Sequence, residues 1–293
     1  MSVTSFDAQG GLDEELLRVH LRRLGAAGVG VYVASQGSGE GDLLSFDEKV
    51  AVYRVAAEEL RGTVPVAAAG IGLAASTATT CALAAAAERA GVDAVQIIGP
   101  RPGPLRLRAD ELSAHLRAVV EAVGCEVQLS NNTALAGYEI PVELVEELVD
   151  DYPHVRVVNV SDPNVDALRA YVARLVDRFG ARIEVRVGMV REIVTMHALG
   201  ARGVLCFEAN VAPRLVTDVW DALEGGRTPP VDALLRCNTA LARGGNPRSL
   251  KAALEILGVD GGFLRAPYLP LLAGERAELE RALRGLGLAD GLG

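Results

Sequence analysis

Apolar and polar positions follow two patterns along the first two thirds of the chain. Short apolar runs have the length and composition of buried strands. Between them, apolar residues recur every three or four positions, which is typical of amphipathic helices. We therefore expect strands at residues 29–34, 64–69, 93–98, 126–130, 155–160, 183–187 and 203–207. Helices are expected at residues 13–27, 45–61, 76–90, 109–123, 142–150, 165–179 and 190–199.

The even alternation of strand and helix predicts an α/β fold with a parallel sheet. The units recur at a spacing of roughly 30 residues, as βαβ units do. This regularity favours a (β/α)₈ TIM barrel, for which an eighth strand is needed. The short segment Ser2–Phe6 is the candidate. An open, doubly wound sheet also has continuous apolar strands and is the alternative architecture.

Beyond residue 213 the strand pattern ends and only helical patterns follow. They are expected at residues 215–223, 230–241, 249–257 and 274–286. We interpret this part as a C-terminal helical extension of the barrel. The predicted division is a (β/α)₈ barrel over residues 1–221 and a helical subdomain over residues 222–293.

Charge and composition narrow the range of partners. The chain has 29 basic and 38 acidic residues, a net charge of −9, which disfavours nucleic acid and anionic membranes as main partners. It has no apolar run of about 18 residues and no signal-peptide pattern, so a cytoplasmic protein is expected. The four cysteines are scattered without a C-x-x-C pair. Neither a metal site nor a cofactor is predicted.

Polar residues close several of the apolar runs. The active site of a TIM barrel lies where its strands end. Ser161 follows the run over residues 155–160, and Asn159 shares its face because side chains alternate along a strand. Ser130 ends the run over residues 126–130 and is followed by Asn131. In the run over residues 183–187, Arg186 would bind a carboxylate if its face is interior, and would be a surface residue touching a helix if it is not.

Two further places carry candidate chemistry. The run over residues 29–34 is followed by a glycine-rich loop in which Gly37 and Ser38 would let backbone N–H groups approach a carboxylate. An ordinary turn explains the same residues. Glu208, near the end of the last run, is an acid–base candidate, although the more common role for such a residue is to fix the loop that follows.

Several segments match a known family when their order and spacing are taken together. They are Gly37–Glu40, Leu44-Ser45, Glu48-Lys49, Ala90–Ala94, Ser130-Asn131 with Gly137, Gly203–Cys206, Ala209–Pro213, Lys251–Leu254, and Gly258 with Arg265–Pro267. Over nearly its whole length the chain resembles the dihydrodipicolinate synthase/N-acetylneuraminate lyase family of barrel enzymes.

The resemblance implies an aldolase-type mechanism. In the family, a lysine at the end of the sixth strand forms a Schiff base with a 2-oxo acid, a tyrosine at the end of the fifth relays protons, and the glycine-rich loop holds the carboxylate. Here Ser161 stands at the lysine position and Ser130 at the tyrosine position. Only two lysines exist, Lys49 on the helix after the loop and Lys251 in the tail. A hydroxyl forms no iminium, so the Schiff-base step is predicted to be absent.

Two hypotheses follow. In the first, the protein is a lyase with altered chemistry that acts on a small 2-oxo acid or carboxylate. Ser161 and Ser130 would be catalytic, and the substrate would be bound by Gly37, Ser38, Asn131, Asn159 and Arg186. In the second, it is a catalytically inactive family member with a binding or regulatory role. Because family members are commonly dimers or tetramers, a homodimer or homotetramer is expected in either case.

Overall fold

Two compact units make up the structure, a computed structural model that describes residues 1–73, 75–101 and 107–288. The first unit combines residues 1–66 with residues 206–293, and the second unit spans residues 67–205. The two units are described separately below. None of the helices among the described residues combines the length and apolar character needed to cross a membrane.

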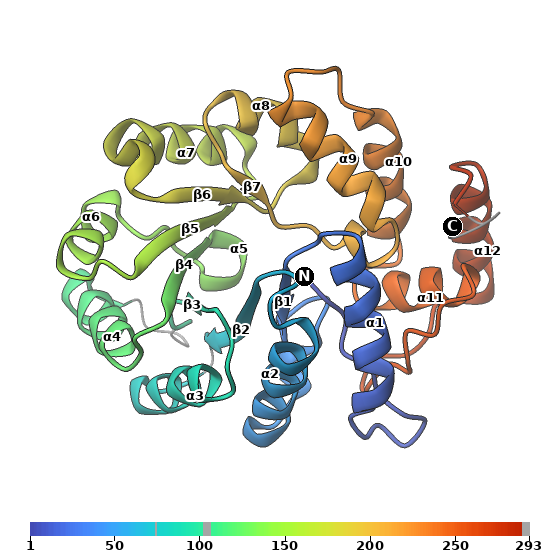
Figure 1. Cartoon of the computed structure of the whole chain (residues 1–293), viewed down its shortest axis with the longest axis horizontal. Coiled ribbons are helices and arrows are strands. Elements are labelled where there is room, and N and C mark those ends of the chain that lie inside the picture. Colours follow the sequence, from blue (N-terminus) through green and yellow to red (C-terminus); the bar gives the residue numbers. More distant parts are fainter. Residues whose placement is uncertain (74, 102–106, 289–293) are drawn as a thin grey trace. The chain divides into compact units, whose positions relative to one another are not determined.

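The second unit is a parallel sheet with helices along one side. Its strands pair in sequence order: β2 Val66–Gly72, β3 Ala94–Ile98, β4 Glu126–Asn132, β5 Val155–Ser161, β6 Glu184–Val187 and β7 Gly203–Val204. The helical elements are α3 Thr77–Arg89, α4 Ala109–Glu121, α5 Thr133–Ala136, α6 Val142–Asp151, α7 Val165–Phe179, α8 Ile193–Ala198, and the 3₁₀ turns η2 Gly180–Arg182 and η3 Val190–Glu192. Figure 1 shows α3, α4, α6 and α7 along the same side of the sheet.

The two faces of this sheet differ in polarity. One face carries fully buried apolar side chains, among them Val95, Ile97, Val127, Leu129, Val158, Val160, Val185 and Val187. This face meets the helices, because a Cβ atom at Gly99, which continues the same face of β3, would lie 3.4 Å from Leu112 of α4. The opposite face carries the polar residues Gln96, Gln128, Ser130, Asn159, Ser161 and Arg186. The amphipathic helices therefore cover the apolar side and leave the polar side to line a site.

The first unit is mostly helical. Its elements are α1 Glu14–Ala26, β1 Val31–Val33, η1 Gly41–Leu43, α2 Phe46–Leu60, η4 Glu208–Asn210, α9 Pro213–Glu224, α10 Val231–Ala242, α11 Arg248–Ile256 and α12 Ala273–Arg284. Asp13 caps α1, and Ser45 forms a capping box with Glu48 at the start of α2. These caps satisfy N–H groups that have no partner inside the helix.

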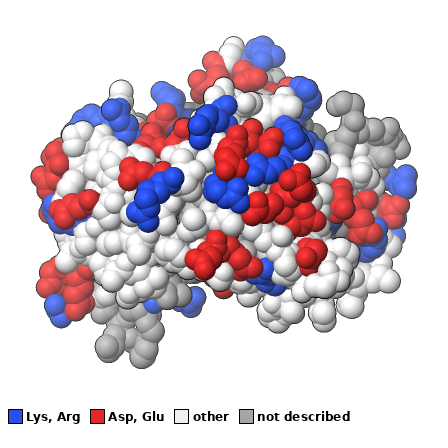
Figure 2. All heavy atoms as spheres, turned by 60° about the horizontal axis from the view of Figure 1, so that its bottom comes forward, with Lys and Arg blue, Asp and Glu red and all other residues white. Residues whose placement is uncertain are grey.

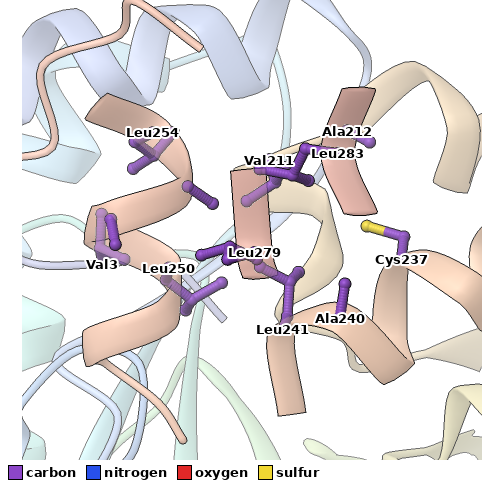
Figure 3. Close-up of a cluster of buried hydrophobic side chains, with 12 residues drawn as sticks. Val3, Val211, Ala212, Cys237, Ala240, Leu241, Leu250, Leu254, Leu279 and Leu283 are labelled. Atoms are coloured by element: carbon purple, nitrogen blue, oxygen red, sulfur yellow. The ribbon is translucent and has the colours of Figure 1, made fainter. Parts of the chain in front are cut away.

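A buried apolar cluster joins the last helices to the chain's beginning. Figure 3 shows Leu250 and Leu254 of α11 facing Leu279 and Leu283 of α12, with Val3 packed in the same cluster. Burial of large apolar side chains is the main source of stability in such a core. The C-terminal helices thus share one core with the N-terminal segment. The predicted division after residue 221 stays a prediction.

The observed elements follow the predicted ones closely, with one exception at the N-terminus. Each of the seven predicted strands is present among the described residues, although the last is reduced to Gly203–Val204. The predicted strand Ser2–Phe6 is wrong: only Phe6 forms an isolated bridge, with Leu12. The reason is a side chain. Asn210 Oδ1 accepts a hydrogen bond from the Val3 N–H at 3.0 Å. A side-chain amide therefore takes the place of the backbone carbonyl that a neighbouring strand would offer to Val3.

On the face drawn in Figure 2, acidic and basic residues do not form separate patches. Acidic and basic side chains are interspersed there. Many form pairs between neighbouring helices, such as Arg18 with Glu58 at 2.7 Å and Arg54 with Glu14 at 2.8 Å. The face drawn in Figure 2 shows no extended basic stripe of the kind that contacts a nucleic-acid backbone.

The apolar cluster generates a stability prediction. Leu250→Ala should lower the free energy of unfolding by about 2–5 kcal/mol, because it deletes buried methyl groups and leaves a cavity. Leu269→Ala is the matched control, since Leu269 is 72% exposed, and it should cost less than about 0.5 kcal/mol. Urea unfolding followed by circular dichroism measures both. Equal losses in the two variants would contradict the packing described.

Candidate functional site

Three of the predicted site residues form one row across the second unit's sheet. Ser130 of β4 lies opposite Asn159 of β5, and Asn159 lies opposite Arg186 of β6. Ser130 and Asn159 are buried. Asn159 Nδ2 donates to Gln128 Oε1 at 3.3 Å, and Gln128 Nε2 donates to Glu126 Oε1 at 2.8 Å. The polar face thus carries a connected network of hydrogen bonds, as buried polar groups require.

Arg186 lies on this polar face and not on the face that meets the helices. Its Nε and Nη2 atoms donate to Glu184 Oε2 at 3.0 and 2.6 Å. The arginine side chain is about one quarter exposed and the glutamate one half. Arg186 therefore already has a carboxylate partner, and an incoming substrate carboxylate would have to compete with Glu184.

Ser161 closes β5 on the same polar face. A Cβ atom at Gly188 would lie 3.0 Å from Ser161 Oγ, so glycine is what allows the two strand ends to approach. The next residue, Asp162, accepts hydrogen bonds from Thr133 Oγ1 at 2.6 Å and from the Asn164 N–H at 2.7 Å. Asp162 thereby ties the end of β5 to α5, the short helix that follows β4. It also binds Asn164, which caps α7.

Asn131 points to the other side of the sheet. Its Oδ1 accepts a hydrogen bond from the Ile140 N–H at 2.8 Å, which fixes the segment before α6. Strand alternation separates it from Ser130, its neighbour in sequence. The contact gives Asn131 a structural role, and the substrate-binding role assigned to it from the sequence stays a prediction.

In the first unit, the glycine-rich loop after β1 is tightly wound. The Gly39 N–H donates to Ser35 Oγ at 3.2 Å, and the Gly41 N–H donates to the Ser35 carbonyl at 2.9 Å. A Cβ atom at Gly39 would lie 2.6 Å from the Ser35 nitrogen, so no larger residue fits there. Ser38 is buried, whereas the space around Gly37 is open.

A buried ion pair holds the end of this loop. Glu40 has a left-handed backbone with φ of 50°, and Lys251 Nζ lies 2.6 Å from its Oε1 as an ion pair outside hydrogen-bond geometry. Both side chains are almost completely buried. The backbone N–H of Arg265 donates to Glu40 Oε2 at 2.9 Å. Burial lowers the pKa of Lys251, and the charge of Glu40 opposes that shift.

A second pair fastens the helix that follows the loop. Arg265 binds Glu48 with two hydrogen bonds of 2.6 and 2.8 Å and also donates to the Leu43 carbonyl at 2.9 Å. These bonds lower the pKa of Glu48 to about 2. Arg265 also lies over the Phe6 ring, 4.2 Å from its centre. Two residues of the C-terminal region, Lys251 and Arg265, therefore fix the loop and the start of α2.

Sequence reasoning placed Lys251 and Arg265 in a family pattern but gave neither a role. The available signal was the position of Lys251 among Leu250, Ala252 and Leu254, in a helix stretch that reads as buried. A lysine in such a place needs an acidic partner. What the sequence did not reveal is that the partner is Glu40, far away in the chain.

Two further ionisable groups, Lys49 and Glu208, lie in the first unit. Burial lowers the pKa of Lys49, on the first turn of α2, against the raising effect of Asp42. Glu208 is fully buried, and its Oε1 accepts a hydrogen bond from Asn238 of α10. Burial raises the pKa of Glu208. This contact agrees with the loop-fixing role. Among the described residues, no group of three or more His, Cys, Asp or Glu side chains could hold a metal ion.

The family model and the similar proteins agree on one family. A family model described as "Dihydrodipicolinate synthetase family" matches residues 1–286. A 4-hydroxy-tetrahydrodipicolinate synthase of Methanopyrus kandleri is 30% identical over 284 residues, which are 95% of this chain and 91% of the relative. An uncharacterised DapA-like lyase of Halobacterium salinarum is 32% identical over 293 residues, covering 98% of this chain and 92% of the relative.

Two solved structures share the fold. Dihydrodipicolinate synthase from Aquifex aeolicus aligns with a TM-score of 0.89 at 25% identity, over 98% of this chain and 96% of that one. A prophage protein of the dihydrodipicolinic acid synthase family from E. coli K12, solved in complex with pyruvate, aligns with a TM-score of 0.88 at 24% identity. That alignment covers 98% of this chain and 96% of the other.

The buried ion pair predicts a large effect of a small change. Glu40→Gln should lower the free energy of unfolding by about 3–5 kcal/mol, because it leaves the buried Lys251 ammonium without a counter-charge. Adding Lys251→Met should recover most of that loss. The exposed pair of Glu280 and Arg284 is the control, and Glu280→Gln should leave the free energy of unfolding almost unchanged. A loss as small as the control's would show that Glu40 and Lys251 do not depend on each other.

The pair of Glu48 and Arg265 predicts a dependence on pH. The pKa of Glu48 is lowered from 4.5 to about 2 in the folded protein, so its stabilising effect is complete above pH 4.5. It is lost as the pH falls from about 4.5 to about 2. Thermal unfolding of the protein and of Glu48→Gln should therefore differ at neutral pH and converge on acidification. A constant difference down to pH 2 would contradict the assignment.

Proposed function

The chain belongs to the dihydrodipicolinate synthetase family, and we propose that it acts on a small 2-oxo acid or carboxylate without forming a Schiff base. That it is an aldolase- or lyase-like protein follows from the family. The observation that carries the mechanistic part of the proposal is Ser161 at the end of β5, on the polar face that it shares with Ser130 and Asn159.

A Schiff base requires an amine, and only two side chains of this sequence carry one. A lysine amine forms the iminium that makes the neighbouring carbon acidic, and a serine hydroxyl has no equivalent. Only Lys49 and Lys251 could replace the missing amine. Lys251 is held by Glu40 in a buried pair, and freeing it would leave a buried carboxylate without its partner. Lys49 lies on the first turn of α2 and not at a strand end.

The remaining chemistry is hydrogen bonding and proton transfer. We assign Ser161 and Ser130 as the catalytic hydroxyls, which would polarise a carbonyl oxygen or pass a proton. Asn159 would orient the substrate through its amide. Arg186 would bind a carboxylate by exchanging Glu184 for the substrate, since its guanidinium is already paired.

The glycine-rich loop of the first unit carries the other residues proposed to bind substrate. Gly37 and Ser38 would bind a substrate carboxylate through backbone N–H groups and one hydroxyl. The tight winding of the loop and its attachment through Glu40 support this assignment, because a rigid loop holds its donors in place without a cost in ordering. Asn131 is also a proposed binding residue, from the family pattern, and to bind substrate it would have to give up its hydrogen bond with the Ile140 N–H.

We also propose the finer architecture from the family. It is a closed (β/α)₈ barrel over residues 1–221 with a C-terminal helical extension over residues 222–293. The protein would be a cytoplasmic homodimer or homotetramer. The match to the synthase from Aquifex aeolicus over 98% of this chain supports the barrel. No cofactor is proposed, because hydrogen-bonding and acid–base groups supply the chemistry.

A second function is favoured by one observation. Arg186, on the polar face, is already paired with Glu184, so a substrate carboxylate would have to displace that partner. The protein would then be an inactive family member with a binding or regulatory role. The two functions differ in turnover, which proton NMR of 2-oxo acids mixed with the protein measures. Consumption of a bound 2-oxo acid supports the enzyme, and binding without consumption supports the regulatory role.

The absence of a Schiff base gives a direct prediction. After incubation with pyruvate and borohydride, mass spectrometry should show no covalent adduct, because no amine stands at position 161. The double variant Ser161→Lys with Ser130→Tyr restores the amine and the phenol and should gain one reduced pyruvate. An adduct on Lys49 or Lys251 of the unmodified protein would overturn the proposal. No adduct in the double variant would show that the site differs from the family at further positions.

A further inference from the structure

A cavity of about 520 Å³ lies in the C-terminal part of the first unit, outside the site proposed above. It is formed by α11, the loop over residues 258–264 and the segment over residues 270–276. Cavities of this size accommodate small organic molecules, for which the usual range is about 300–1,000 Å³. It therefore offers a separate binding site.

The walls of the cavity are mainly apolar. Ala252 of α11, Val259, Leu264 and Leu271 contribute aliphatic surface. Phe263 also lines the cavity, and 59% of it is exposed, which is unusual for a phenylalanine. An exposed aromatic ring beside an apolar cavity favours a ligand with an apolar body.

Two of the three cations that line the cavity are paired with carboxylates. Arg276 pairs with Glu255 at 2.9 Å, and Lys251 pairs with Glu40. Asp260 accepts a hydrogen bond from the Gly262 N–H at 2.9 Å. These groups therefore have partners before any ligand arrives.

The exception is Arg248. Its Nε donates to the Leu269 carbonyl at 3.0 Å, and its guanidinium lies over the Tyr268 ring, 5.2 Å from the centre. Among the residues described, no carboxylate lies within ion-pair distance of Arg248. The backbone bond and the ring hold the guanidinium in place while its Nη groups keep their capacity to bind an anion.

We propose that this cavity binds a small amphipathic anion, a carboxylate or sulfonate with an apolar or aromatic body. The anionic group binds the guanidinium of Arg248, and the body packs against Leu264, Leu271 and the ring of Phe263. Bidentate binding of such a group by arginine is geometrically favoured over binding by lysine.

Occupancy of the cavity is coupled to the glycine-rich loop. Lys251 lines the cavity, and its Nζ binds both Glu40 and the carbonyl of Phe263, which also lines the cavity. A ligand that orders Phe263 thereby orders the contact that holds the end of the loop. By linkage, ligand binding and loop order stabilise each other.

The binding site is tested with two fluorescent probes. One is 1-anilinonaphthalene-8-sulfonate, an amphipathic anion, and the other is N-phenyl-1-naphthylamine, which has a similar ring system without the charge. The protein should bind the sulfonate saturably. Arg248→Gln should weaken that binding about tenfold, as expected for the loss of a charge-assisted hydrogen bond. Arg248→Lys should retain part of the affinity, and Arg284→Gln, outside the cavity, should leave it unchanged.

The neutral probe separates the charge from the apolar walls. Its affinity should be the same in the unmodified protein and in Arg248→Gln. Equal sulfonate affinity in Arg248→Gln and Arg284→Gln, or no saturable sulfonate binding at all, would overturn the site.

The coupling is tested by hydrogen exchange. Adding the sulfonate should slow the exchange of the Gly39 and Gly41 amides in the unmodified protein and not in Arg248→Gln. Exchange that is unchanged at saturating probe would overturn the coupling. Neither measurement depends on turnover, so the outcome is independent of the function proposed for Ser161.

Discussion

The buried ion pair between Glu40 and Lys251 is the contact on which the first unit most depends. Two charges removed from water cost several kcal/mol each, and their mutual attraction and further hydrogen bonds offset that cost. Here Glu40, which has a left-handed backbone, meets Lys251 of α11 at 2.6 Å. The Arg265 N–H binds the second oxygen of the same carboxylate. The glycine-rich loop and the C-terminal helices, far apart in sequence, are therefore parts of one folded unit.

This pair also limits the chemistry. The aldolase mechanism implied by the family resemblance uses a lysine amine, and the chain has only two lysines. One of them is committed to Glu40, so the pair that holds the loop also removes an amine from use. The polar face of the second unit's sheet, with Ser130, Asn159 and Ser161, offers hydroxyl and amide groups in place of an amine. The structural role of Lys251 and the proposed loss of the Schiff base are consistent with each other.

The sequence predicted the strands and the shared face of Asn159 and Ser161, because both follow from local periodicity. The cross-strand register of Ser130 with Asn159 adds Ser130 to that face. The sequence did not predict the contact of Asn131 with Ile140, since alternation along one strand says nothing of the loop that returns to it. Nor did it predict that Asn210 replaces a strand partner for Val3, because such a pairing joins distant segments.

The most direct test of the account uses the scarcity of lysines. In protein labelled with ¹⁵N-lysine, NMR should show two side-chain ammonium signals, and Lys49→Arg assigns them. We expect the Lys251 signal to be protected from exchange with water and to stay unchanged when pyruvate is added. Loss of the Lys251 ammonium signal on addition of pyruvate, as an imine forms, would contradict the structural role of Lys251.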